Sequence, residues 1–443
     1  MANNSAMKAF LQSEFMREYG MIFVLLLLVV LFSLLTFTTL HPKGEKAGRD
    51  VAQNILAGQV AAPNVLVVAG NTFGDKAFAG AVQKDLAAGG APVLLVVNAE
   101  KPADVKSAIQ TLVDEGKSID AIAATQTASN WMVYQKVEGT PRITPTSSTI
   151  SLFLTFSNLI GIANQTAIYA IIGIGMTMVI ISTGIDLSVG SLIALSSMCA
   201  SVFIRDIGGG DEASLLMMLV GCSLGIGVCA FSGSFVGVMV TGFRVPAFIV
   251  TLAVMLVARG VALRLGDGES INALPASISW LGAKDTLHIP NQVILMVVLY
   301  IIAHVVMSKT TFGRHIYAIG GNAEAARLSG IRVNRTLIAV YTSCGALAGL
   351  GGVILTSELD AGDPTLGEMY ELEVIAAVVV GGTSLMGGQG RIFGTLIGAF
   401  IIAVIKNGMN MMNVRPFDQL IVLGAVLLLA VLLDTLKRRS LKT

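Results

Sequence analysis

Charged residues are scarce in this sequence. Asp, Glu, Lys and Arg make up 13% of the 443 residues, whereas a soluble globular domain carries about 25%. A deficit of this size excludes an ordinary soluble domain, and the net charge of +1 lacks the basic surplus that nucleic-acid binding needs. Because 54% of the residues are hydrophobic and the mean hydropathy is +0.77, we expect the chain to lie in a lipid bilayer.

Cysteine and histidine are also few. The four histidines are widely scattered, and the four cysteines fall inside apolar runs: Cys199, Cys222, Cys229 and Cys344. This pattern argues against a disulfide framework or a metal site. The sequence contains no P-loop GxxxxGK[ST], no HExxH and no GxSxG beside a strand. We therefore expect no catalytic, metal or cofactor site, and no ATP hydrolysis by this chain alone.

Apolar runs of membrane-spanning length recur along the chain. A transmembrane helix needs about 20 mainly apolar residues, and the sequence has about ten such runs, the eighth short and interrupted by glycine. The first is longer than a signal-peptide core and lacks a convincing cleavage site, so we interpret it as a retained helix. The predicted spans are 20–40, 166–183, 187–203, 215–241, 247–265, 292–307, 337–355, 372–385, 392–411 and 419–433.

Lys and Arg are concentrated in alternate loops. With the N-terminus in the cytoplasm, the cytoplasmic side receives the basic loop 309–335 and the basic cluster 437–442, while the short outer loops hold few basic residues. The positive-inside rule therefore places both termini in the cytoplasm. We predict an α-helical, multi-pass protein of the inner (plasma) membrane.

One polar segment, 41–149, interrupts the membrane pattern on the predicted outer side. A continuous apolar, β-branched run, typical of a strand buried on both faces, occurs at 64–70, and further strands are predicted at 92–98 and 120–124. Helix-compatible stretches alternate with them at 75–88, 101–115 and 128–137. This order predicts a small parallel sheet. The predicted domains are a cytoplasmic N-terminus with the first helix (1–40), an extracytoplasmic α/β insertion with a linker (41–149) and a transmembrane core (150–443).

Two polar motifs interrupt the predicted core. Asp186 lies between the second and third spans, close to Ser188, and is either an N-cap of the third helix or a pathway or gate residue; the two roles are compatible. A glycine-rich stretch interrupts the end of the eighth span and includes Gly381, Gly382, Thr383 and Ser384. Close helix packing and a broken helix lining a cavity both explain it.

Charged and amide side chains also occur within predicted spans. Lys406 and Asn407 interrupt the apolar segment 401–411, and Lys406 either snorkels to the interface or contacts a substrate. Glu371 and Glu373 flank the start of the eighth span, and Arg259 lies in the fifth. For Glu371, Glu373 and Arg259, an ion pair among the three and a ligand site are both open interpretations.

The predicted cytoplasmic loop 312–333 contains a short helix. Asn322 is placed to cap residues 323–328, and Gly330 to end them. This element is either a solvated surface helix or a docking element for a cytoplasmic partner.

Four long segments resemble the permease subunits of ribose-, galactose- and xylose-type ABC importers. The resemblance covers roughly 18–40 and 150–437. The segments are STGIDLSVGSLIAL (182–195), FRVPAFIVTLAVMLVARGVAL (243–263), FGRHIYAIGGNAEAARLSGI (312–331) and YELEVIAAVVVGGTSLMGGQGRIFGTLIGAF (370–400).

The resemblance implies import of a monosaccharide such as ribose, xylose or galactose. It implies three partners besides the bilayer: a cytoplasmic ABC ATPase that binds the ATP, an extracytoplasmic sugar-binding protein, and a second permease subunit in a homo- or heterodimer. The implied ATPase-docking loop is Gly321, Asn322, Ala323, Glu324, Ala325, Ala326, Arg327 and Leu328. The candidate pathway or gate residues are Asp186, Ser188, Gly381, Gly382, Thr383, Ser384 and Asn407.

The chain departs from that family at two places. Relatives usually carry Asn or a small apolar residue at the position of Lys406, and most join the first two spans by a short loop. The insertion here resembles one lobe of the sugar-binding proteins that serve these importers, through AIAATQTASNWMV (121–133). Thr127 stands where such proteins place a sugar-contacting Asp, and 75–88 lacks their usual Arg. We therefore expect a degenerate lobe that docks, gates or stabilises.

Two other functions compete with the importer. A secondary, ion-coupled transporter would need intramembrane carboxylates, and Asp186 alone gives this hypothesis little support. A ligand-sensing membrane protein would need a cytoplasmic output domain, which the short segment after the last predicted span does not provide.

Overall fold

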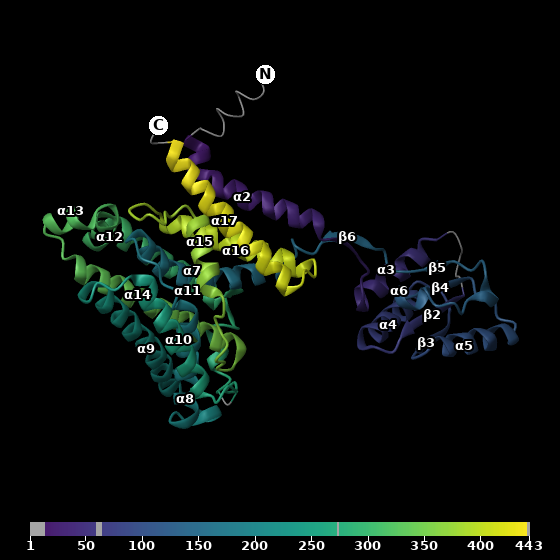
Figure 1. Cartoon of the computed structure of the whole chain (residues 1–443). Helices are drawn as coiled ribbons and strands as arrows, with labels where there is room; N and C mark the ends of the chain where they lie inside the picture. Colours follow the sequence, from purple (N-terminus) through teal and green to yellow (C-terminus); the bar gives the residue numbers. More distant parts are fainter. Residues whose placement is uncertain (1–13, 59–63, 273, 441–443) are drawn as a thin grey trace, which may run out of the picture. The chain divides into compact units, whose positions relative to one another are not determined.

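The chain forms two compact units in the computed structural model, which describes residues 14–58, 64–272 and 274–440 (Figure 1). The first unit, Phe37–Leu152, is an α/β domain, here called the lobe. The second consists of the chain on either side of the lobe and is a bundle of helices.

Seven helices of the bundle are long and apolar enough to cross a membrane, judged by length and composition over the described residues. They are α7 (Phe156–Ile181), α8 (Val189–Asp206), α9 (Leu215–Gly242), α10 (Ala247–Leu265), α11 (Asn291–Lys309), α14 (Val333–Leu359) and α16 (Ile392–Met411). The other predicted spans correspond to α2 (Glu14–Leu35), α15 (Tyr370–Val380) and α17 (Pro416–Ser440). The apolar parts of α2 and α17 are shorter, and α15 has 11 residues. A polytopic helical protein is thus supported, while the total of ten stays a prediction.

Short elements connect these helices. They are the 3₁₀ turns η2 (Gly210–Glu212) and η3 (Ile278–Trp280), the two-residue strands β7 (Asp285–Thr286) and β8 (Ile289–Pro290), and the helices α12 (Thr311–Gly321) and α13 (Ala323–Leu328). β7 and β8 pair antiparallel.

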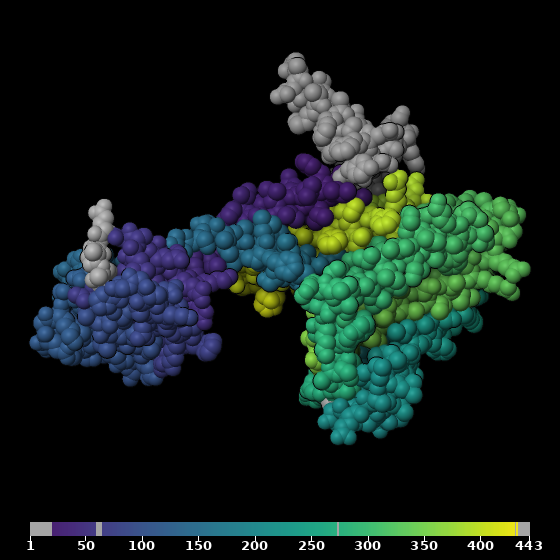
Figure 2. All heavy atoms as spheres, turned by 180° about the vertical axis from the view of Figure 1, so that it is seen from behind, coloured from purple at the N-terminus to yellow at the C-terminus, as the bar shows by residue number. Residues whose placement is uncertain are grey.

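The bundle is built around α7. Every residue from Thr166 to Ile181 is buried, whereas α9, teal in Figure 2, exposes large apolar side chains such as Leu216 and Phe231. Such a surface suits lipid contact. On its other side α9 packs so closely on α14 that a Cβ atom on Gly345 would overlap the Cys229 carbonyl oxygen. Glycine is therefore required where these two backbones meet.

Two boundaries predicted near the start of the bundle are wrong. The first span ends at Leu35 instead of residue 40, and Phe37–Leu40 form strand β1. The second span was predicted to start at residue 166, whereas α7 starts at Phe156. Polar side chains such as Asn158 hide that earlier start in the sequence, since their partners lie inside the bundle.

The lobe contains a four-stranded parallel sheet of order β3-β2-β4-β5. Its strands are β2 (Val65–Gly70), β3 (Val93–Ala99), β4 (Ala121–Ala124) and β5 (Arg142–Ile143). Alternate residues of β2 face opposite cores. Val65 and Val67 pack with α3 (Gly44–Leu56) and α4 (Phe73–Ala88), and Leu66 and Val68 with α5 (Pro102–Asp114).

Three details of the lobe differ from the predictions. Helix α3 lies in a stretch to which no helix was assigned. The predicted helix 128–137 is wrong: the chain forms the single turns α6 (Gln126–Ser129) and η1 (Gln135–Val137), because Tyr134 between them is buried and donates to the Ala128 carbonyl oxygen at 2.8 Å. The segment predicted to be a linker contains β5.

The lobe begins and ends with a two-stranded ribbon. β1 pairs antiparallel with β6 (Ser148–Ser151), with Phe37 opposite Ser151 and Leu40 opposite Ser148. The chain therefore enters and leaves the lobe through adjacent strands.

Candidate functional site

The junction between α7 and α8 is a buried polar turn. Asp186 is fully buried, and its Oδ1 accepts hydrogen bonds from the backbone N–H of Ser188 at 2.9 Å and from the Ser188 hydroxyl at 2.6 Å. The N-cap of α8 is Ser188, so Asp186 orders the turn before the helix instead of capping it directly. On the other side of this turn, Gly184 lies against the Tyr341 hydroxyl of α14.

The glycine-rich stretch 381–391 is an interruption between two helices. α15 ends at Val380 and α16 starts at Ile392. Thr383 donates its N–H to the Val378 carbonyl oxygen at 3.1 Å, and both Thr383 and Ser384 are buried. Gly382 has a φ of 84°, which favours glycine. A Cβ atom on Gly381 would overlap Gly394, which agrees with close packing. The helix is broken here, while the lining of a cavity by this stretch stays a prediction.

This stretch meets the α7–α8 junction. The Gly388 N–H donates to the Ile181 carbonyl oxygen at 2.8 Å, and Gly387 lies against the Thr183 methyl group. From α12, Gly320 packs against the Ile181 carbonyl, and Tyr317 donates to the Gly390 carbonyl oxygen at 2.8 Å. The structure thus brings the end of α7, the glycine-rich stretch and α12 together.

Helix α13 has the form that the sequence predicts. Asn322 is its N-cap, and the side-chain oxygen accepts the N–H groups of Glu324 at 3.0 Å and Ala325 at 2.9 Å. Gly330, with a φ of 85°, follows the helix. Leu328 is 83% exposed, so α13 presents an apolar side chain on a capped surface helix.

Lys406 forms an ion pair with Glu373, a partner that the sequence did not predict for it. The ammonium donates to Glu373 Oε1 at 2.6 Å and to the Tyr169 hydroxyl at 2.9 Å. It also lies 5.5 Å from the ring centroid of Tyr169 and 5.6 Å from that of Tyr370. These four residues, from α7, α15 and α16, are called the Lys406 cluster below.

The other polar side chains singled out in the core lie elsewhere. Arg259 donates to the carbonyl oxygens of Pro364 and Leu366 at 2.7 and 3.0 Å. Asn407 exchanges amide hydrogen bonds with Asn158, at 2.9 and 3.1 Å, and so joins α16 to the start of α7. Asn407 and Lys406 are neighbours in sequence. The hydrogen bonds described here for these two side chains do not reach the glycine-rich stretch.

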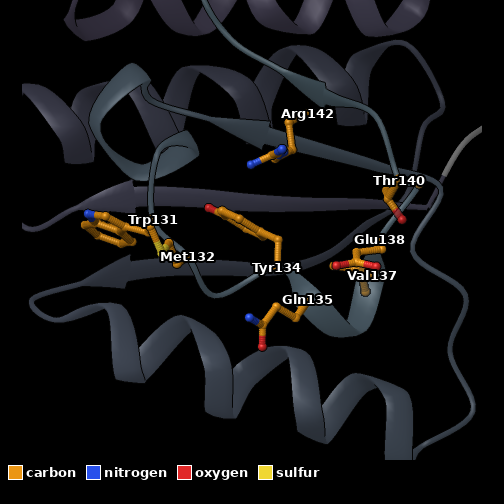
Figure 3. Close-up of a pocket in the computed structure, with 9 residues that line it drawn as sticks. Trp131, Met132, Tyr134, Gln135, Val137, Glu138, Thr140 and Arg142 are labelled. Atoms are coloured by element: carbon orange, nitrogen blue, oxygen red, sulfur yellow. The ribbon is translucent and has the colours of Figure 1, made fainter.

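The lobe has two cavities of its own. One of about 280 Å³ is lined by the loop before β5 and includes Trp131, Tyr134 and Arg142 (Figure 3). The Arg142 guanidinium carbon lies 5.3 Å from the Tyr134 ring centroid, and burial raises the pKa of Tyr134 to about 12 despite this cation. The other cavity, of about 140 Å³, is lined in part by Thr127 and His41.

The chain is similar to known transport proteins. Residues 158–431 match the family described as branched-chain amino acid transport system / permease component. The ribose import permease protein RbsC of Escherichia coli K12 is 44% identical over 290 residues, which are 65% of this chain and 88% of that protein. RbsC of Bacillus subtilis 168 is 46% identical over 287 residues, 64% and 87% of the two chains.

A xylose permease is also similar. The xylose transport system permease protein XylH of E. coli K12 is 38% identical over 357 residues, 67% of this chain and 89% of that protein. No solved structure matches the chain. The relatives are transport permeases and not enzymes, and with the apolar helices they support a multi-pass protein of the inner membrane. Because the matched segment covers more than half of the sequence, the chain belongs to this family of transport-system permease components.

Proposed function

We propose that the chain is the membrane-spanning subunit of an ABC importer that carries a monosaccharide of the ribose or xylose class. The observation that carries this proposal is the 38–46% identity to ribose and xylose permeases, spread over 87–89% of their length. The family description alone leaves branched-chain amino acids open, and the similarity to sugar permeases favours a sugar.

We propose that α13 is the docking element for the cytoplasmic ATPase. It is a short helix whose cap fixes its start, and its exposed Leu328 offers an apolar contact to a partner. The positive-inside bias of the sequence supports a cytoplasmic position for this loop and for both termini. A second permease subunit, identical or homologous, would complete a pathway, and a sugar-binding protein would deliver the substrate from outside.

We also propose that the α7–α8 junction and the glycine-rich stretch form a gate. Asp186, Ser188 and the residues Gly381–Ser384 lie in non-helical backbone, which the interior of a membrane protein tolerates only where it is buried or lines a cavity. The bond from Gly388 to Ile181 and the packing of α12 link this region to the loop that carries α13. Asn407 lies at a different point, where its hydrogen bonds with Asn158 join α16 to α7.

For the lobe we propose a docking, gating or stabilising role outside the membrane, in keeping with the predicted domains 1–40, 41–149 and 150–443. The lobe has the β/α order of one half of a sugar-binding protein, yet Thr127 replaces the expected Asp. The family match begins at residue 158, after the lobe, so the permease core is defined without it. A full-length chain in detergent that binds a pentose or hexose tightly by calorimetry, without a separate binding protein, would contradict this role.

Uptake tests the main proposal. The chain is expressed with an ABC ATPase and a sugar-binding protein from the same genome, in a strain without its own ribose, xylose and galactose permeases. We expect uptake of at least one labelled sugar, which ATP depletion abolishes and a proton ionophore leaves intact. Replacing Ala323–Leu328 by glycines should abolish both uptake and recovery of the ATPase in a pull-down. Uptake that needs the proton gradient and no ATPase would instead support a secondary transporter.

A further inference from the structure

Glu373 has a carboxylate oxygen that the ion pair does not use. The side chain is only 7% exposed, and Oε1 accepts the Lys406 ammonium at 2.6 Å. Among the described residues, none donates a hydrogen bond to the buried Oε2. A buried carboxylate oxygen without a donor is costly, and buried polar atoms are normally satisfied. Oε2 therefore has an acceptor position that a water molecule or a ligand hydroxyl group can fill.

Two residues of the Lys406 cluster are also partly accessible, Lys406 at the surface and Glu373 at a cavity. The Lys406 side chain is 23% exposed, although it lies in an otherwise apolar part of α16. Glu373 lines a cavity of about 100 Å³ whose other walls are residues of α15 and α17 and the adjoining Met369. None of those other lining residues is charged. A cavity of this volume holds about three water molecules, or the edge of a small polar ring.

The chemistry of the cluster suits a neutral, hydroxyl-rich ligand. Oε2 of Glu373 can only accept, while the Lys406 ammonium has three protons and makes two recorded hydrogen bonds. A hydroxyl group can donate to the first and a neighbouring hydroxyl can accept from the second. Tyr169, which is fully buried, and Tyr370, with ring centroids 5.1 Å apart, pack beside these polar groups. A charged ligand fits less well, because the cluster carries both signs.

We propose that the Lys406 cluster is a contact site for the transported sugar inside the permease core. Glu373 Oε2 accepts a hydrogen bond from one sugar hydroxyl, and Lys406 donates to an adjacent one. The site assignment rests on the proposed function, since it names groups that touch the substrate of that importer. Such a site distinguishes this chain from a permease whose pathway has no charged side chains, because Glu373 and Lys406 select for a particular pair of sugar hydroxyls.

Import of deoxy sugars tests the site. The chain is reconstituted in liposomes with its ATPase, and the sugar-loaded binding protein is supplied at saturating concentration for each sugar. The maximal import rate is measured for the parent sugar and for each monodeoxy analogue. In the wild-type chain, removal of one particular hydroxyl should lower the rate about tenfold or more, the range for a lost bond to a charged group. In Glu373→Gln this difference should fall to about twofold or less, because the charged acceptor is gone.

A charge exchange separates contact from structural support. Glu373→Lys combined with Lys406→Glu keeps an ion pair between α15 and α16, so the thermal stability in detergent should return toward that of the wild type. A contact site would still show a changed preference among the deoxy analogues. If the exchanged variant, or Glu373→Gln, kept the wild-type preference, the cluster would be a structural ion pair and the proposal would be overturned.

Two controls complete the design. Asp418→Asn removes an exposed partner of Arg415, 3.2 Å away and outside the cluster, and should leave the sugar preference unchanged. Wild-type chains that import no sugar would refute the proposed function itself. Wild-type chains that import sugar with no sensitivity to any single hydroxyl would refute only the contact site.

Discussion

The close approach of α9 and α14 makes a quantitative prediction for Gly345→Ala. The added Cβ atom would overlap the carbonyl oxygen of Cys229, and Gly233 on the same face of α9 already packs against the Tyr341 carbonyl. Both neighbours are backbone atoms, so no side-chain rotation relieves the overlap. The helices must separate, and overpacking of this kind costs about 1–3 kcal/mol. By the scaling of soluble domains, the apparent Tm should fall by roughly 2–6 °C.

Gly227→Ala, on the partner helix α9, is the matched control. Nothing lies within 4 Å of a Cβ atom at Gly227, and alanine is favoured over glycine in a helix by about 1 kcal/mol. We expect its unfolding temperature to equal or exceed that of the wild type. The assay is thermal unfolding of the purified chain in one detergent, followed by size-exclusion chromatography of the remaining monodisperse fraction. Equal unfolding temperatures for the two variants would refute the packing argument.

Further predictions concern α13 and the lobe. Asn322→Ala should remove the cap of α13, cost about 1 kcal/mol of local helix stability and weaken ATPase recovery in a pull-down, whereas Asn322→Asp should retain it; equal recovery would contradict the docking role. Because burial raises the pKa of Tyr134 to about 12 from 10.0, the unfolded lobe releases this proton first, so lobe stability should fall as pH rises from 10 to 12. Tyr134→Phe should lack this pH dependence in chemical unfolding of the lobe, and its persistence would assign the effect to another group. Joining Leu40 to Ser148 by an Asn-Gly turn should remove the lobe and leave a folded permease core, as measured by monodisperse elution in detergent; aggregation of this variant alone would show that the core depends on the lobe.

Local sequence signals predicted the elements that depend on neighbours in the chain. The bounds of α10 match the predicted 247–265, because an apolar run of this length has one stable form in a bilayer. The cap of α13 was also predictable, since Asn322 bonds N–H groups only two and three residues away. The end of α2 was not, because Phe37 and Leu40 continue the apolar run although they belong to a strand.

The candidate site depended on contacts that the sequence does not encode locally. The choice of Glu373 as the partner of Lys406 requires α15 and α16 to lie side by side, and Glu371, two residues earlier, instead lies against Gly190. The meeting of Gly388 with Ile181 joins segments more than two hundred residues apart. The sequence shows charged residues and glycines inside apolar segments at these positions, but only the packed bundle identifies their partners.

The β1–β6 ribbon has a consequence for how a bundle can acquire a whole extra domain. The ribbon holds the two points of attachment in register, with Leu40 opposite Ser148. The entropy of closing a loop grows only with the logarithm of its length, by about 0.6 kcal/mol for each doubling. Placing the whole lobe between α2 and α7, instead of a short hairpin, therefore adds little to the entropic cost of closing this connection. A single genetic insertion at such a ribbon could add a soluble domain without any compensating change in the helices.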